Sequence, residues 1–503
     1  MERGALILKR PDVKFEKEYS LFIGGQWVKA SDGATMKAYC PADGSHLADI
    51  AQATAEDVDK AVKAAWEAFP KWSKTTKQER AKILNKIADV IDENAEHLAM
   101  VETLDNGKPI RETLGVDIPE AANHFRYFAG VIEADEGSLN VLDKDNLSLV
   151  LREPLGVVGQ IVPWNFPFLM GAWKLAPVLA AGDCTVLKPS STTSLSVLEL
   201  IKLIEDIVPA GVINIITGSG SKSGQYMLDH EGFSKFAFTG STEVGYNVAR
   251  AAADKLIPAT LELGGKSANI FFKDCDMDLA IDGLLLGILF NQGQVCCAGS
   301  RIFVQEDIYD EFVKRAVEEF KKVKVGLPWD PKTQMGAQIN KGQVSKILKY
   351  IDIAKDEGAE ISAGGCQILE DKLSDGFFMM PTLITNVTND MTVAREEIFG
   401  PVASVIKFKY EEDVIKMAND SEYGLGGAVW TRDINKAIRV SKAMETGRVW
   451  VNTYNSIPAG APFGGYKKSG IGRETHKMIL DAYSQVKNII INTSEKPSGF
   501  YNI

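Results

Sequence analysis

Two hydrophobic periodicities divide the first half of the chain. Between residues 55 and 130, apolar residues such as Val58, Val62, Ala65 and Phe69 recur at helical spacing, which predicts a mainly helical segment. From residue 155 onward, short β-branched apolar runs alternate with helical stretches. The alternation predicts strands at 157–162, 185–187, 212–217, 236–239 and 260–263, and helices at 168–180, 195–208, 224–230 and 244–253.

Strands that are apolar along their whole length and alternate with helices are typical of a doubly wound parallel sheet. The expected fold class is therefore α/β, with ligands bound at the carboxyl ends of the strands. A second αβ block follows between residues 266 and 465. Its clearest elements are an apolar helix at 277–290, a strand at 301–305 and an amphipathic helix at 309–323.

Two segments do not fit either block. Residues 137–153 contain a polar turn at 143–146 between two short strand-like runs, and residues 486–491 form a lone apolar strand. An isolated hairpin is marginally stable, and unpaired strand edges are a liability. We therefore expect both segments to pair with another subunit, giving a homodimer or a homotetramer.

Composition and charge exclude several classes. Lys and Arg number 56 and Asp and Glu 67, a net charge of −11, which argues against nucleic acid or an anionic membrane as partner. No stretch approaches the roughly 18 apolar residues of a membrane span, and residues 1–10 lack the pattern of a signal peptide. The six cysteines are scattered without a CxxC pair and the five histidines are dispersed. We expect a cytoplasmic protein with no disulfide framework and no metal site.

Two adjacent cysteines are the first candidates for chemistry. Cys296 and Cys297 follow the predicted apolar helix within the string Phe290-Asn-Gln-Gly-Gln-Val-Cys-Cys-Ala-Gly. Its glycines, Gly293 and Gly299, permit tight turns and close approach of a ligand. Buried cysteines commonly act as small apolar residues, but this polar, glycine-rich setting favours a reactive thiol. The spacing by itself does not separate the two cysteines.

This string resembles the active-site motif of the aldehyde dehydrogenase superfamily. Three other strings resemble motifs of the same family in the same order: Pro163-Trp-Asn-Phe-Pro167, Leu261-Glu-Leu-Gly-Gly-Lys-Ser267 and Glu397-Ile-Phe-Gly-Pro401. In the family motif the nucleophile follows Gly-Gln-x, which selects Cys296. The resemblance implies a hydrolytic, non-CoA-acylating, NAD(P)-dependent enzyme that oxidises an aldehyde to a carboxylic acid.

The resemblance also implies three catalytic roles. Cys296 attacks the aldehyde to give a thiohemiacetal, Asn165 and the Cys296 backbone N–H stabilise the oxyanion, and Glu262 is the general base that hydrolyses the thioester. Lys174 and Glu474 match family positions that tune or relay protons near that glutamate. The alternatives are a buried structural role for Glu262 and a turn role for Asn165 between two prolines.

A strand-turn-helix at 238–245 is the candidate dinucleotide site. Gly240 and Gly245 permit close approach to a pyrophosphate, and Ser241 offers a hydroxyl at the helix N-terminus. A competing glycine-rich string, residues 218–224, also follows a strand, and either string alone is weak evidence. The family resemblance selects 240–245. It further implies a cofactor site that includes Ile161, Pro163, Trp164, Lys188, Ser191, Leu263, Glu397 and Phe399.

Ser191 departs from the commonest family pattern. Many NAD-preferring relatives carry a glutamate three residues after the lysine that matches Lys188, where it would repel a 2′-phosphate by like charge. Serine is neutral and can donate to a phosphate oxygen. We therefore expect NADP to be accepted as well as NAD. Alternatively, Ser191 is only a loop or capping serine, and NAD alone is used.

The resemblance implies three structural parts. These are a dinucleotide-binding domain at 1–131 and 154–265, a catalytic domain at 266–465, and an oligomerisation hairpin and tail at 132–153 and 480–503. The expected tunnel for a small aldehyde is mostly apolar and is lined by Phe166, Met170, Trp173, Val295, Cys297 and Tyr454. No arginine in that set would bind a substrate carboxylate, so semialdehyde acids are disfavoured, and the aldehyde itself does not follow from the sequence.

Three rival functions remain to be separated. A CoA-acylating dehydrogenase needs no hydrolytic base, so Glu262 argues against it. A cofactor-free thiol esterase or acyltransferase does not need Glu397 or the strand-turn-helix. A structural protein on this fold would have no need to keep Cys296, Glu262 and Asn165 together.

Overall fold

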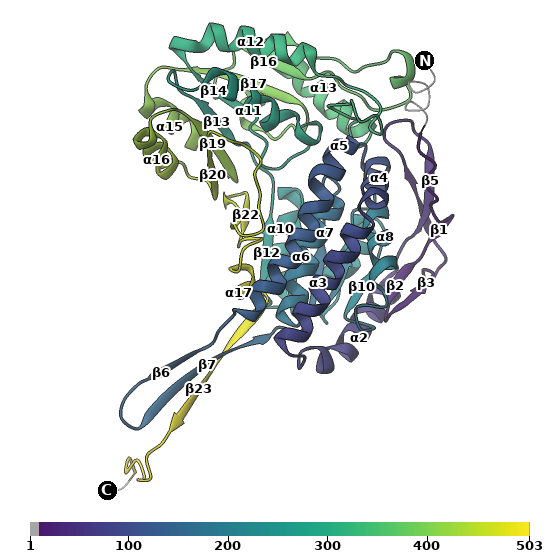
Figure 1. Ribbon diagram of the computed structural model, residues 1–503, viewed down its shortest axis with the longest axis vertical. Coiled ribbons are helices and arrows are strands. Elements are labelled where there is room, and N and C mark those ends of the chain that lie inside the picture. Colours follow the sequence, from purple (N-terminus) through teal and green to yellow (C-terminus); the bar gives the residue numbers. More distant parts are fainter. Residues whose placement is uncertain (1–9, 502–503) are drawn as a thin grey trace.

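The computed structural model describes residues 10–501. An eight-stranded sheet forms the centre of one half of the molecule (Figure 1). The expectation about a signal peptide concerns residues 1–9, which lie outside the described residues. In spatial order the strands are β22 (Gly470–Ile471), β12 (Ala259–Glu262), β11 (Lys235–Thr239), β8 (Val157–Ile161), β9 (Cys184–Lys188), β10 (Ile213–Ile215), β2 (Leu21–Ile23) and β3 (Gln26–Val28). The five strands from β12 to β10 are parallel, and antiparallel strands close both edges.

Helices pack around this sheet, and β9 and β11 are buried along their whole length. The helices of this half are α2 (Ala55–Trp72), α3 (Lys77–Glu93), α4 (Ala95–Asn106), α6 (Ile118–Glu133), α7 (Pro167–Ala181), α8 (Leu195–Ile204), α9 (Gln225–Asp229) and α10 (Thr242–Asp254). Helix α2 begins with a capping box between Thr54 and Asp57, a feature that stabilises a helix start by about 1 kcal/mol. The predicted α/β, doubly wound fold is confirmed.

A seven-stranded sheet forms the centre of the other half (Figure 1). Its order is β15 (Glu360–Ala363), β16 (Thr382–Thr385), β17 (Val402–Phe408), β14 (Arg301–Gln305), β13 (Ala268–Phe271), β19 (Gly426–Trp430) and β20 (Arg448–Val451). All neighbours are parallel except β15 and β16. The helices of this half are α11 (Met277–Leu289), α12 (Tyr309–Lys322), α13 (Lys341–Asp356), α15 (Glu411–Asn419) and α16 (Ile434–Ala443).

Smaller elements connect the two halves and their edges. They are β1 (Glu18–Tyr19), β4 (Thr35–Tyr39) and β5 (His46–Ala51) in one sheet, β18 (Tyr423–Gly424) and β21 (Tyr466–Lys467) in another, and the short helices α5 (Ile110–Glu112), α14 (Thr392–Arg395) and α17 (Ile479–Ala482). Strand β22 brings the chain after residue 465 back to the first sheet, which the sequence pattern did not indicate. Helix α8 ends at Ile204, four residues before the expected end at 208, because residues 205–207 form a turn.

A three-stranded antiparallel sheet projects from the body of the molecule (Figure 1). It contains β6 (Ser138–Val141), β7 (Asn146–Pro154) and β23 (Ser484–Asn492), in the order β23-β7-β6. The prediction of a lone strand at 486–491 is wrong, because β23 pairs with β7 of the same chain from Ser484↔Pro154 to Asn492↔Asn146. More than 300 residues separate the two strands, so local pattern could not reveal the pairing.

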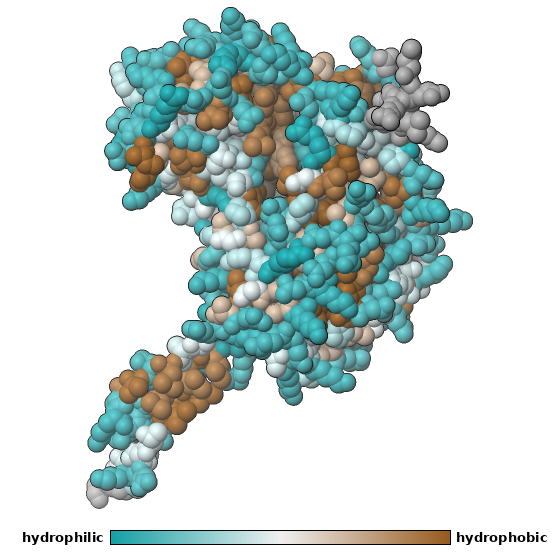
Figure 2. Space-filling view, viewed as in Figure 1, coloured by the Kyte–Doolittle hydropathy of each residue, from teal (hydrophilic) through white to brown (hydrophobic). Residues whose placement is uncertain are grey.

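Apolar side chains remain exposed on this sheet, which we call the extension (residues 138–154 and 484–492). Leu139, Val141, Val486 and Ile490 are each more than 60% exposed. Figure 2 shows a hydrophobic patch on the projecting lobe at the lower left. Among residues 10–501, no helix combines the length and the apolar character that crossing a bilayer requires.

Candidate active site

A cavity of about 400 Å³ opens where loops of the first half meet loops of the second. Strands β8, β11 and β12 contribute the residues at or just after their carboxyl ends, as expected for a parallel sheet. Most of the expected site residues line this cavity: Pro163, Trp164, Asn165, Gly240, Ser241, Glu262, Leu263, Cys296, Glu397 and Phe399. Residues far apart in the sequence thus meet in one place.

The cysteine lies after an unusual turn. Helix α11 ends at Leu289, and the next residues include Asn291, Gln292 and Gly293 with φ angles of 47°, 56° and 72°. Left-handed backbone at a non-glycine residue costs about 1–3 kcal/mol and persists only where the surroundings hold it. At Gly293 a Cβ atom would lie 2.2 Å from the backbone of Gly400, so only glycine fits. The turn is fixed by its neighbours rather than by its own preference.

The two cysteines differ in exposure. Both line the cavity, but Cys296 is half-buried whereas Cys297 is fully buried, with its Sγ 3.8 Å from Asn455 Oδ1. This difference favours Cys296 as the accessible thiol. Hydrogen bonding with the Cys297 thiol, followed by burial, raises the pKa of Cys296 well above its usual value. The thiol must therefore lose its proton to a base, or at alkaline pH, before it can act as a nucleophile.

Asn165 supplies a free amide donor at the cavity wall. It lies in the loop between β8 and α7, is almost fully buried, and donates from Nδ2 to the backbone oxygen of Gln294 at 2.9 Å. An amide nitrogen carries two donors, so one N–H is left over. Within the described chain the backbone N–H of Cys296 also donates to no other group. These two donors are the ones that an oxyanion beside Cys296 would need.

Glu262 is a buried carboxyl at the end of β12. It is 3% exposed, and neither of its oxygens has a hydrogen-bond partner among residues 10–501. Burial, and then the nearby Glu474 carboxyl, raise the pKa of Glu262 well above its usual value. Lys174 forms a fully buried ion pair with Glu474 and partly offsets this effect. An unpartnered buried carboxyl is costly, and its position on a cavity wall indicates a role in the chemistry.

The opposite wall has the features of a dinucleotide site. Gly240 and Ser241 line the cavity where α10 begins, and Ser241 caps this 13-residue helix by accepting from the Val244 N–H at 3.3 Å. Glu397 accepts from the Gly265 N–H at 3.0 Å. At Gly264, a Cβ atom would lie 2.5 Å from the Glu397 carboxylate, so this glycine keeps the wall open. Helix N-termini with small residues bind phosphate groups.

Four of the expected cofactor residues do not line the cavity. Ile161 and Lys188 are paired at the ends of β8 and β9, and Ser191 lies half-buried before α8. Burial lowers the pKa of Lys188 to about 8, and among residues 10–501 its Nζ donates only to Pro189 O, at 3.1 Å. At Gly245, a Cβ atom would lie 2.4 Å from Leu263, so this glycine permits helix packing rather than close approach of a ligand.

The competing glycine-rich string at 218–224 does not line the cavity. Its Ser223 hydroxyl donates to the backbone oxygen of Ala53 at 2.7 Å, and a Cβ atom at Gly224 would lie 3.7 Å from the Lys188 side chain. The string therefore forms a turn beside Lys188 rather than a wall of the cavity.

The tunnel side is largely as expected. Phe166, Met170, Trp173, Val295 and Cys297 line the cavity, whereas Tyr454 does not and instead donates to Cys297 O at 2.9 Å. Polar residues that the sequence analysis missed also line it, among them Glu120, Gln343 and Lys346. Gln343 and Lys346 are three residues apart on α13 and therefore share one face of this helix. Their spacing is visible in the sequence, so both could have been considered as residues that act together with Glu397.

Comparison with known proteins agrees with this site. The family model described as "Aldehyde dehydrogenase family" matches residues 27–489. Aldehyde dehydrogenase B from Escherichia coli (strain K12) is 48% identical over 496 residues, which cover 97% of this chain and 96% of that protein.

Two solved structures are similar over nearly the whole chain. The NAD+ complex of an aldehyde dehydrogenase from Bacillus cereus is 43% identical with a TM-score of 0.93, covering 96% of this chain and 100% of that one. The NAD+ complex of betaine aldehyde dehydrogenase from Staphylococcus aureus is 42% identical with a TM-score of 0.94, covering 96% and 97%. The chain belongs to the aldehyde dehydrogenase family.

Proposed function

We propose that this protein oxidises an aldehyde to a carboxylic acid with NAD, and also with NADP, using Cys296 as nucleophile, Asn165 as oxyanion donor and Glu262 as general base. The observation that carries the proposal is that these three side chains line one cavity whose other wall holds Gly240, Ser241 and Glu397. Family membership supplies the reaction class, and the geometry supports the assignment of roles to residues.

The first step is addition of sulfur to carbon. The Cys296 thiolate forms a C–S bond with the aldehyde carbon, and the carbonyl electron pair moves to oxygen. The spare N–H of the buried Asn165 amide and the Cys296 backbone N–H would donate to that oxygen. Removing one such donor in other enzymes costs about 3–4 kcal/mol of transition-state stabilisation.

Residues of the cofactor wall fit a dinucleotide. The buried ammonium of Lys188 donates to Pro189 O and has further N–H groups that suit ribose hydroxyls or a phosphate, and Gly240 with Ser241 suits a pyrophosphate. Glu397, held by the Gly265 N–H, suits hydroxyls of the nicotinamide ribose, with Phe399, Trp164, Pro163 and Leu263 around it. When bound, the nicotinamide supplies the acceptor for the hydride that leaves the aldehyde carbon, and a thioester remains on Cys296.

Hydrolysis of the thioester then requires Glu262. Its carboxylate takes a proton from water as the water oxygen bonds to the acyl carbon, and the C–S bond breaks to release the acid and the thiolate. Because burial and the nearby Glu474 carboxyl raise the pKa of Glu262, the ionised base is harder to form than at an exposed glutamate. The buried Lys174–Glu474 pair lies close enough to act on that equilibrium.

The domain assignment is part of the same proposal. Residues 1–131 and 154–265 would bind the dinucleotide, 266–465 would carry the nucleophile, and 132–153 with 480–503 would join subunits in a dimer or a tetramer of dimers. The separate sheets and the exposed apolar extension support this division. The cytoplasmic location expected from the sequence stays a prediction.

The decisive test mixes the purified protein, an aldehyde and NAD or NADP without CoA, and follows absorbance of the reduced nicotinamide. We expect continuous turnover and equimolar acid. Turnover only with CoA would point to the acylating class, and ester cleavage without any aldehyde oxidation would point to a thiol esterase. No change with any member of an aldehyde panel would contradict the proposal.

A further inference from the structure

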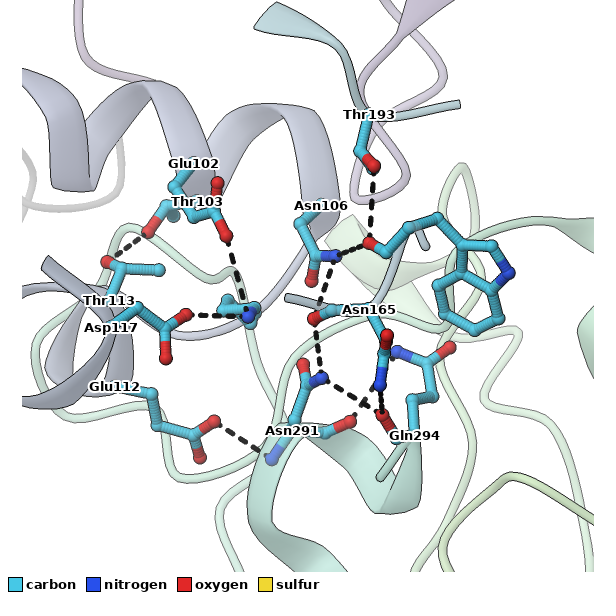
Figure 3. A network of polar contacts seen from close by, with 12 residues as sticks. Glu102, Thr103, Asn106, Glu112, Thr113, Asp117, Asn165, Thr193, Asn291 and Gln294 are labelled. Carbon is cyan, nitrogen blue, oxygen red and sulfur yellow. Dashed lines mark hydrogen bonds and ion pairs between the residues drawn. The ribbon is translucent and has the colours of Figure 1, made fainter. Parts of the chain in front are cut away.

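A buried polar network joins residues 102–117 to the two loops that carry the active-site donors (Figure 3). We propose that Glu112 and Asn106 are positioning residues, which hold the turn before Cys296 and the loop of Asn165 in the register that aims both oxyanion donors at one point. The inference rests on the proposed function, and neither residue lines the cavity.

Glu112 holds the left-handed turn. It ends the short helix α5, is 6% exposed, and its Oε2 accepts from the Asn291 backbone N–H at 2.9 Å. Asn291 is the first of the three residues with positive φ in that turn. A buried N–H at the end of a helix needs a partner, and this carboxyl provides it at the point where the strained backbone begins.

Asn291 passes this constraint to Asn165. Its Nδ2 donates to the backbone oxygen of Asn165 at 2.8 Å and to that of Gln294 at 3.2 Å. The Asn165 side chain donates to the same Gln294 oxygen at 2.9 Å. Two hydrogen bonds therefore link the Cys296 turn to the Asn165 loop, and the third, within the turn, shares the Gln294 acceptor, so a shift of the turn must move the Asn165 amide.

Asn106 holds the Asn165 loop from α4. As the last residue of that helix it is fully buried, and its Nδ2 donates to Trp164 O at 2.7 Å and approaches Asn165 O at 3.5 Å. The Thr193 hydroxyl also donates to Trp164 O, at 3.3 Å. Both carbonyl groups of the 164–165 segment are thus fixed, which leaves the Asn165 side chain little freedom to turn away from the cavity.

A buried ion triad anchors the segment that carries these two residues. Lys108 Nζ lies 2.6 Å from Asp117 and 3.6 Å from Glu102, and it sits 4.1 Å above the ring of Phe166. The three charged side chains are fully buried. Because Phe166 directly follows Asn165, the triad fastens α4, the π-helical turn Thr113–Asp117 and the Asn165 loop to one another.

The test compares variants of Glu112 in a reaction that needs the oxyanion donors but no cofactor. Cys296 should attack p-nitrophenyl acetate, form an acetyl thioester and release nitrophenolate. Burial raises the pKa of Glu112 to about 8, so its carboxyl group is mostly protonated and neutral at pH 7. Glu112→Gln therefore keeps both the neutral state and an oxygen that accepts the Asn291 N–H. We expect Glu112→Ala to slow acylation about 10- to 100-fold through misplacement of the donors, and Glu112→Gln to retain most of the rate.

Two controls separate positioning from general damage. Alkylation of Cys296 by iodoacetamide needs no oxyanion donor and should stay unchanged in Glu112→Ala. Asp183 is a matched buried carboxyl that accepts the Gly156 N–H at 2.9 Å, and Asp183→Ala should lower Tm yet leave acylation unchanged. Asn106→Asp, which replaces the donor by an acceptor facing Trp164 O, should slow acylation as Glu112→Ala does.

Normal acylation in Glu112→Ala, an equally slow Glu112→Gln, or a parallel fall in alkylation would overturn the inference. If Glu112→Ala does not fold, Glu112→Asp keeps the acid but withdraws the oxygen by one methylene and must show the same split. Cys296→Ala is measured alongside. Undiminished acylation in that variant would contradict the proposed nucleophile, which is a separate failure from that of the positioning role.

Discussion

In most proteins apolar side chains are buried and charged side chains are exposed. The wall of the active-site cavity and the extension depart from this pattern in opposite ways. Behind the cavity the protein buries ionisable and amide side chains, including Glu262, Lys174 and Glu474. On the extension it exposes leucine, valine and isoleucine side chains to solvent. Both choices cost stability in an isolated chain, since buried polar groups lose hydration and exposed apolar groups order water.

The difference between the two regions indicates where each finds compensation. Buried polar groups are compensated inside the chain by hydrogen bonds, or are left free for a substrate, so they indicate chemistry. The exposed apolar side chains of the extension are not covered by any other part of residues 10–501, so they indicate contact with another chain. Changes at the cavity should therefore alter turnover without altering mass, and changes at the extension should do the reverse.

Removing the nucleophile should give the largest effect. Cys296→Ala should abolish dehydrogenase turnover, because no other group can form the thiohemiacetal, while Cys297→Ala should retain most of it. Both variants should keep the assembly state and Tm of the parent protein. Steady-state kinetics and light scattering check this, and the reverse pattern of activity would show that the assignment of Cys296 over Cys297 is wrong.

Replacing the proposed base should separate hydride transfer from hydrolysis of the thioester in time. Glu262→Gln should release about one equivalent of reduced cofactor per site in rapid mixing and then stall, because only thioester hydrolysis needs the base. In the parent protein, turnover should rise with pH through the alkaline range, since both Glu262 and Cys296 have raised pKa values and act only after losing a proton. Loss of the first equivalent, in protein shown to bind cofactor, would contradict a purely hydrolytic role.

Much of the fold could be predicted from local pattern. The strands from β8 to β12 are largely buried on both faces, so their sequences are mostly apolar and easy to recognise. The β7–β23 pairing was missed because it joins segments more than 300 residues apart. The N-terminal strands β1 to β5 were also missed, because they are short and mix buried with exposed positions.

The site residues that belong to recognisable sequence motifs and line the cavity could be predicted from the sequence. The supporting residues could not, since Asn106, Lys108 and Glu112 belong to a helical segment whose polar residues would ordinarily be placed on the surface. Tertiary contacts explain their burial, since Glu112 binds the Cys296 turn, Asn106 binds the Asn165 loop and Lys108 pairs with buried carboxylates. Gly245 was expected to permit close approach of a pyrophosphate, whereas in the structure Leu263 occupies the space beside it.

The extension offers the matched experiment on the opposite side of the comparison. Val486→Lys combined with Ile490→Lys places two charges on one exposed face of β23. We expect the parent protein to be a dimer or tetramer and this variant to dissociate toward the mass of one chain. Gln485→Lys, on the other face of the same strand, should leave the assembly intact. A parent protein that is already monomeric in light scattering at micromolar concentration would contradict the proposed role of the extension.

Ser191 is half-buried, between the buried polar residues of the cavity wall and the exposed apolar residues of the extension. Its replacement tests the predicted use of NADP. Ser191→Glu should lower kcat/KM for NADP by about tenfold or more, equivalent to ~1.4 kcal/mol, while NAD is little affected. Ser191→Ala separates charge from hydrogen bonding, since it removes the hydroxyl donor without adding an anion. If the parent protein already rejects NADP by more than about a thousandfold, the interpretation of Ser191 fails.

A buried carboxyl away from the cavity tests whether a buried ionisable group must take part in the chemistry. Its replacement is expected to have the smallest effect on turnover. Burial raises the pKa of Asp183 to about 8, so the folded state holds its proton where the unfolded chain is ionised. The folded state then binds more protons than the unfolded one, and stability falls as pH rises from about 4 to 8, by up to about 1.4 kcal/mol per pH unit. Asp183→Asn keeps an acceptor for the Gly156 N–H but cannot ionise, so the free energy of unfolding in urea should depend less on pH between about pH 5 and pH 8. Turnover should be unchanged, because Asp183 does not line the cavity. An unchanged pH slope would show that Asp183 titrates normally, and a loss of turnover would extend the chemically active region beyond the cavity wall.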